Sequence, residues 1–121
     1  MISSNKKTIQ QTAQMATKAL GEGSVAVETL ADSDEVYGVN VKLINPRLLR
    51  QDKPSSISFS YDKDLGYFID IDQTTLEYGC DKEKFLSQSR LYIHAISAGE
   101  MRIVQKRILG IIPLRKKLKI G

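Results

Sequence analysis

The stretch ISFSYDKDLGYFIDID, residues 57–72, indicates the fold more clearly than any other part of the chain. In each of its two arms every second residue is aliphatic or aromatic: Ile57, Phe59, Tyr61, Tyr67, Ile69 and Ile71. A period of two is typical of a strand that buries one face. The polar segment DKDLG between the arms contains a glycine, which favours a short turn. The stretch therefore predicts a β-hairpin.

Alternation with the same period precedes the hairpin. VAVETL at 25–30 and VYGVNVKLI at 36–44 predict two strands, joined by a DSDE turn at 32–35. Residues 46–55, PRLLRQDKPS, are expected to form a polar loop because proline and polar residues cluster there.

Helical spacing predicts two helices, one before and one after these strands. The apolar residues of the first are Ile9, Ala13, Ala16 and Leu20. Ser3 or Ser4 can cap its start, and Gly21 can end it. Asp81 can cap the second helix, which is expected to run to about Ser97. Within it, residues 90–96 also alternate tolerably as a strand, and residues 101–111 fit a helix and a strand equally well.

The C-terminal residues predict a strand with one basic face. Leu114, Leu118 and Ile120 share one parity, whereas Arg115, Lys117 and Lys119 share the other. Lys116 falls in the apolar register, which is typical of an edge strand.

The predicted elements form a single α+β domain over residues 1–121. It has an N-terminal helix, a mainly antiparallel sheet with a central hairpin, a second helix near 81–97 and a C-terminal basic edge strand. The one cysteine, Cys80, has no partner for an internal disulfide, which fits a reducing compartment. The N-terminus lacks the apolar region of a secretory signal, and no apolar run is long enough to span a bilayer. A cytoplasmic protein is expected.

Few residues have the spacing of a catalytic or metal site. His94 and Cys80 are the only histidine and cysteine, and nothing in the spacing supplies a group to orient the imidazole. Asp62-Lys63-Asp64 resembles the start of a calcium loop but lacks the later ligands. Asp70 and Asp72 share one face of a predicted strand, which weakly suggests a magnesium-dependent nuclease and more strongly suggests solvated residues. No catalytic residue, metal or cofactor is predicted.

Charge is distributed unevenly along the chain. Residues 101–121 contain seven Lys and Arg residues and no acidic residue, whereas residues 1–100 contain 11 basic and 14 acidic residues. The acidic region is a candidate surface for binding a protein partner, through Asp62, Asp64, Asp70, Asp72 and Glu77. The basic end is a candidate surface for nucleic acid, through Arg115, Lys116, Lys117 and Lys119. Association of Ile111, Ile112 and the basic tail with a membrane surface is a further alternative.

Two segments, SFSYDKDLGYFIDID at 58–72 and DKEKFLSQ at 81–88, resemble small bacterial immunity proteins that neutralise polymorphic or contact-dependent toxins. The resemblance implies stoichiometric binding that occludes or disables the active site of a toxin. Immunity proteins against nucleases are often acidic, whereas this chain has a net charge of +4. The leading hypothesis is a non-enzymatic protein-binding module of this type, and the alternative is a small accessory protein that binds nucleic acid through its C-terminal segment.

Overall fold

The computed structural model describes the chain except for residues 1–2, 50–51, 109–111 and 121, and describes only the backbone of 103–108 and 112–120. It begins with helix α1 (Ser4–Leu20) and the short helix η1 (Glu22–Ser24). Five strands follow: β1 (Val25–Asp32), β2 (Val36–Leu43), β3 (Ser56–Asp62), β4 (Gly66–Ile71) and β5 (Thr74–Cys80). Helix α2 (Lys82–Ser97) precedes β6 (Met101–Ile108) and β7 (Ile112–Ile120).

Strands β1 to β5 form one antiparallel sheet in sequence order. The predicted hairpin is its centre, because Phe59 pairs with Ile69 and Tyr61 with Tyr67 across β3 and β4. At the outer strand β1 a bulge interrupts the ladder: Thr29 pairs with Val39 of β2 and Ala31 with Gly38, so Leu30 between them has no partner in the register.

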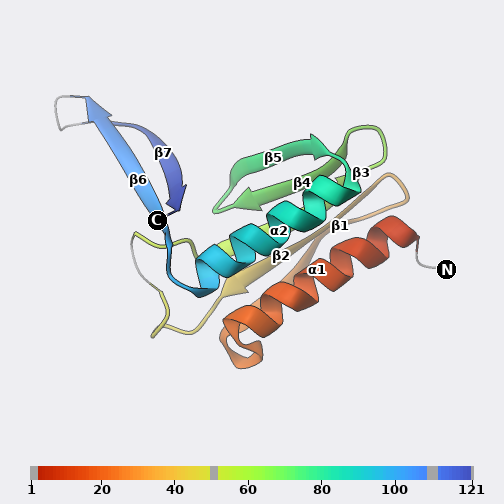
Figure 1. Ribbon diagram of the computed structural model, residues 1–121, viewed down its shortest axis with the longest axis horizontal. Coiled ribbons are helices and arrows are strands. Elements are labelled where there is room, and N and C mark those ends of the chain that lie inside the picture. The colour runs from red at the N-terminus through yellow and green to blue at the C-terminus, as the bar shows by residue number, and fades with distance from the viewer. Residues whose placement is uncertain (1–2, 50–51, 109–111, 121) are drawn as a thin grey trace.

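Both helices cover the same face of the sheet and run side by side (Figure 1). Ser3 caps α1 by accepting a hydrogen bond from the Lys6 N–H at 3.2 Å, and Asp81 caps α2 by accepting one from the Lys84 N–H at 2.8 Å. The core between helices and sheet contains the alternating residues of the sequence: Tyr37, Val39, Val41, Leu43, Ile57, Phe59, Tyr67, Ile69 and Ile71. These contacts confirm the predicted α+β class and both helices.

An aromatic cluster joins α2 to the central hairpin. The ring of Phe85 on α2 stacks on that of Tyr67 with 4.6 Å between centroids, and it meets Phe59 edge-on at 6.0 Å. Phe59 and Phe85 are fully buried. Aromatic pairs in these geometries stabilise a core beyond the area they bury.

Strand β5 is not among the predicted elements, and the placement of Asp72 on a strand beside Asp70 is wrong. Strand β4 ends at Ile71, and Asp72 with Gln73 forms the turn into β5. Both turn residues have positive φ, 48° and 68°. Two such residues make the tight turn whose twist matches an antiparallel pair, but glycine or asparagine normally occupies it. The sequence therefore lacks the usual sign of this hairpin.

The C-terminal strands form a separate two-stranded antiparallel sheet, which we call the arm (residues 101–108 and 112–120). The ambiguous segment 101–108 is thus a strand, and residues 90–96 are helical. The predicted C-terminal strand exists as β7, but it pairs with β6 and not with the main sheet. The arm projects away from the helices and the five-stranded sheet (Figure 1). At its base Met101 is buried in the main core.

Two glycines allow the turn between β3 and β4 to cross the end of β5 closely. A Cβ atom at Gly66 would lie 2.8 Å from the carbonyl oxygen of Cys80, and one at Gly79 would lie 2.7 Å from that of Leu65. Both glycines also have positive φ, 108° and 63°. Backbone atoms on both sides of this crossing leave no room for a side chain.

Replacing the second of these glycines should destabilise the protein strongly. Gly79→Ala forces an unfavourable φ and a contact with the Leu65 carbonyl, so we expect a loss of at least about 2 kcal/mol in the free energy of unfolding. Urea unfolding measures it. The matched control is Gly23→Ala, whose Cβ meets nothing within 4 Å and which should change the stability by less than about 0.5 kcal/mol. Equal stability of the two variants would contradict this account.

Candidate functional site

The structure divides the five predicted acidic residues among four places and does not join them into one patch. Asp62 and Asp64 lie at the turn between β3 and β4, and Asp72 lies at the turn between β4 and β5. Asp70 lies on the sheet face opposite the helices, since its neighbours Ile69 and Ile71 are buried in the core. Glu77 is only 9% exposed and lies on the helix side of β5, paired with Ile69.

Two of these carboxylates accept hydrogen bonds from backbone N–H groups and so stabilise the loops around them. The Asp62 Oδ1 accepts hydrogen bonds from the N–H groups of Asp64 and Leu65, at 2.8 and 3.1 Å. The Asp72 Oδ1 accepts from the N–H groups of Ser55 and Ser56 at 3.0 Å each, and from both serine hydroxyls at 3.2 Å. Asp72 therefore ties the start of β3 to the turn after β4, and these bonds offset the cost of its left-handed backbone.

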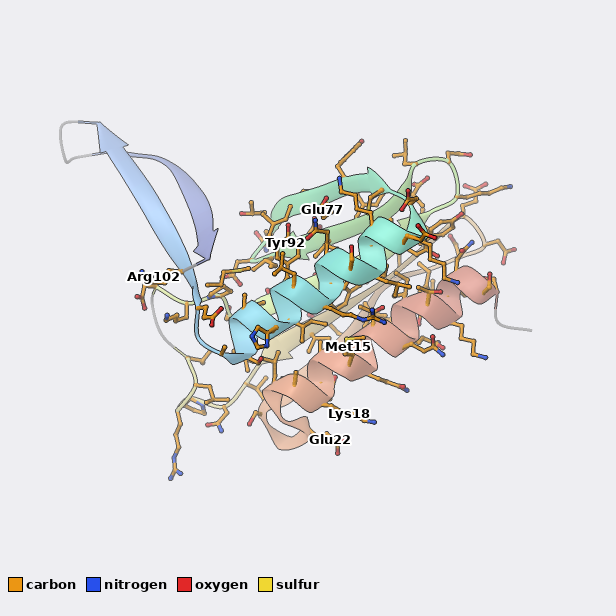
Figure 2. All side chains as sticks on the ribbon, viewed as in Figure 1. Met15, Lys18, Glu22, Glu77, Tyr92 and Arg102 are labelled. Carbon is orange, nitrogen blue, oxygen red and sulfur yellow. The ribbon has the colours of Figure 1, made fainter. Side chains whose placement is uncertain are left out.

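Glu77 forms a partly buried brace between β5 and α2. Its carboxylate accepts a hydrogen bond from the Tyr92 hydroxyl at 2.9 Å and lies 3.5 Å from the Lys84 ammonium. Figure 2 shows Glu77 and Tyr92 next to one another between the strand and the helix. Burial, together with the bond to Glu77, raises the pKa of Tyr92 to about 12. The contact stabilises the fold rather than forming a docking surface.

The face of the sheet opposite the two helices is the candidate site, and we call it the open face. None of the described helices covers it. The strand registers place its residues in rows that cross the sheet. The apolar row contains Leu30, Gly38, Ser60, Phe68 and Tyr78. The polar row contains Glu28, Asn40, Ser58, Asp70 and Thr75.

The apolar row has large exposed side chains at its ends and small residues in its middle. Tyr78 is 72% exposed and its ring meets that of Phe68 edge-on, 4.8 Å between centroids. At the other end Leu30, which the bulge displaces, is 57% exposed. Between them Gly38 has no side chain, and a Cβ there would lie 3.1 Å from the Ser60 Cβ. Exposed aromatic and aliphatic side chains thus flank a floor of small residues.

The polar row contains a chain of hydrogen bonds that stops short of Asp70. Asn40 donates to Glu28 at 3.0 Å and accepts from the Ser58 hydroxyl at 2.7 Å. Asp70 pairs with Ser58 in the register, yet its Oδ1 is buried and has no hydrogen-bond partner within the described residues. A buried carboxylate oxygen without a donor costs free energy, so its presence requires an explanation.

A polar hollow of about 410 Å³ adjoins this row. Its lining includes the charged residues Glu28, Lys42 and Asp72. Charges of both signs surround it, and a partner that fills it would meet donors as well as acceptors.

The basic candidates Arg115, Lys116, Lys117 and Lys119 lie on β7. Their side chains are outside the described residues, as are Ile111 and the side chain of Ile112. Arg102 near the base of the arm is exposed (Figure 2).

The chemistry of the remaining candidates is modest. Cys80 is buried and its thiol donates to the Tyr67 carbonyl at 3.5 Å. Burial raises the pKa of this thiol, which keeps it protonated and a poor nucleophile. His94 is exposed in the last turn of α2. Within the described part of the chain no three His, Cys, Asp or Glu side chains converge as a metal site, and no helix is long and apolar enough to cross a membrane.

Comparisons of this chain with protein-family models, curated proteins and solved structures find no match.

Sequence patterning placed Asp70 among the candidate residues and missed the apolar row. Phe68 occupies the polar parity of the hairpin, among Ser58, Ser60 and Asp70, and an aromatic residue there is the one local indication of an exposed apolar surface. Leu30 reaches the open face only through the bulge, and Tyr78 belongs to the strand that was not predicted.

The brace between Glu77 and Tyr92 predicts a loss of stability in alkali. Because the pKa of Tyr92 is higher in the folded than in the unfolded chain, its contribution is complete below about pH 10 and is lost as pH rises through about pH 12. Urea unfolding at a series of pH values measures this decline. Tyr92→Phe should reduce the loss of stability between about pH 10 and about pH 12. The loss should not vanish, since burial also raises the pKa of Tyr67. An unchanged alkaline slope in the variant would contradict the assignment.

Proposed function

We propose that this chain is a non-enzymatic protein-binding module that uses the open face. In our proposal it acts as an inhibitor of the immunity type and neutralises a cognate toxin by stoichiometric binding in the cytoplasm. The observation that carries the proposal is the unpartnered Asp70 carboxylate oxygen in the polar row, beside an exposed apolar row.

The apolar row has the chemistry of the centre of a protein interface. Tyrosine and phenylalanine supply large, rigid contact areas, and tyrosine is enriched among the residues that dominate binding energy. Tyr78 and Leu30 expose most of their surface, and the small residues Gly38 and Ser60 lie between them. A partner that covers the row removes this apolar area from water.

Asp70 adds a preference for a cationic partner group. The hydroxyl of its neighbour Ser58 already donates to Asn40, so it does not donate to the Asp70 carboxylate. A guanidinium or ammonium group of a partner placed above Asp70 would compensate the charge of its carboxylate. Basic toxins of the nuclease type present such groups, which agrees with the resemblance to immunity proteins although the whole chain is basic.

The proposal is tested by capture with a matched pair of variants. The chain is immobilised as wild type, as the open-face variant Leu30→Ser/Tyr78→Ser, and as Leu91→Ser, which removes a leucine 49% exposed on α2. We expect one protein to be retained by the wild type and by Leu91→Ser but to be lost from the open-face variant. Truncation of a tyrosine that dominates the binding energy typically weakens binding about 30-fold or more.

Reconstitution from purified components then decides between inhibition and mere binding. Calorimetry of the captured protein with this chain should give a 1:1 complex, and the complex should lack the activity of the captured protein. Retention of the same proteins by all three baits, or a complex that keeps its activity, would contradict the proposal.

Asp70 should show a conflict between stability and binding. Asp70→Thr removes the unpartnered oxygen and places a β-branched residue on a strand, so we expect the free energy of unfolding to rise by about 1 kcal/mol. Its affinity for the captured protein should fall, because the proposed cation loses its partner. Thermal unfolding and calorimetry measure the two effects. Asp70→Asn, which keeps the shape but removes the charge, serves as the control and should lose affinity without the gain in stability. A less stable Asp70→Thr would show that the carboxylate serves the fold.

A further inference from the structure

The register of the arm brings basic residues together from its two strands. Arg102 of β6 pairs with Lys119 of β7, and Lys106 pairs with Arg115. Between these two pairs Val104 is opposite Lys117. Positions two apart on paired strands belong to the same face of a ladder. One face of the arm therefore holds five basic residues at six neighbouring positions.

This arrangement is unfavourable in the isolated chain. Like charges directly opposite one another weaken an antiparallel pair. No acidic residue occurs from 101 to 121 to relieve the repulsion within the arm. A two-stranded hairpin is also only marginally stable by itself. A ligand with regularly spaced negative charges would remove the repulsion and stabilise the ladder.

We propose that the arm binds double-stranded DNA through its phosphates, independently of the open face. Charge complementarity indicates a polyanion, and the shape of the arm indicates which one. A two-stranded antiparallel ribbon fits the major groove of B-form DNA, about 12 Å wide, where phosphates line both sides. The major groove of duplex RNA is too deep and narrow to receive it.

The composition of the arm favours duplex DNA over single strands. Proteins that bind single strands stack bases on aromatic side chains. Residues 101–121 contain no Phe, Tyr or Trp. Binding that relies on phosphates requires no aromatic side chain, and it does not depend on base sequence.

The arm is placed so that a duplex can reach it. It extends away from the main sheet (Figure 1) and is anchored at its base, where Met101 is buried in the core. Beside this anchor the Lys53 ammonium donates to the Gly99 carbonyl, which links the loop before β3 to the residues that lead into β6. The open face lies on the main sheet, so one chain has separate surfaces for a protein and for DNA.

The test is fluorescence anisotropy of the full chain with a mixed-sequence DNA duplex of about 20 base pairs, at about 50 and 200 mM salt. If five phosphates are contacted, the affinity of the wild type should fall about 500-fold between the two salt concentrations. In Arg115→Ser/Lys117→Ser/Lys119→Ser the affinity should be much lower at 50 mM, and the decrease with salt should shrink to about tenfold.

The matched control removes the same charge from the helices. Lys7→Ser/Lys18→Ser/Lys82→Ser changes three exposed lysines and should keep both the affinity, within about threefold, and the steep salt dependence. The exchange variant Arg115→Lys/Lys117→Arg/Lys119→Arg should bind like the wild type. In NMR spectra of the wild type, added duplex should shift amide signals of the arm, which locates binding even where a variant disturbs the hairpin.

Four outcomes would overturn the proposal. The first two are no binding of the wild type at 50 mM salt and equal losses of affinity in the arm and helix variants. The third is a set of amide shifts confined to residues outside the arm. The fourth is equal or tighter binding to single strands, duplex RNA or vesicles of anionic lipid.

Discussion

The contact of Phe85 with Tyr67 and Phe59 is the interaction on which the rest of the structure depends. It fixes α2 across the central hairpin, and the hairpin sets the register of the strands on either side. Helix α1 lies beside α2 on the same face, where its small residues Ala13 and Ala16 allow a close approach to the sheet. Because both helices use one face, the apolar residues of the other face remain exposed. The open face is thus a consequence of how the core is packed.

Much of this core was predictable because the signals are local and repeat along the chain. The alternation in 57–71 specifies which residues face the helices, and a slip by one residue would expose all of them. A cap at Ser3 or Ser4 and a cap at Asp81 could be predicted in the same way, since each cap satisfies backbone groups of its own helix. Such features need no knowledge of distant residues.

The missed features depend on partners that are remote in sequence. Gln73 adopts a positive φ that its residue type does not favour, and the neighbouring Asp72 is held by Ser55 and Ser56 across the sheet, so no local pattern announces the turn or β5. The apolar row of the open face combines residues of five strands, and one of them reaches it through a bulge. Within residues 101–111 the apolar spacing satisfies both helical and strand periods, and for 101–108 the pairing with β7 decides between them.

The bulge at Leu30 also governs how the sheet ends. Strand β1 is an outer strand, and an outer strand of regular geometry invites the strands of other molecules to join it. Here the regular ladder of β1 stops at Thr29, and beyond the bulge Asp32 is held by the Lys6 ammonium at 2.9 Å. On β1 the segment from Val25 to Thr29 is the part that offers an uninterrupted edge. The displaced residue that helps to form the open face therefore also shortens the regular edge that β1 offers to strands of other molecules.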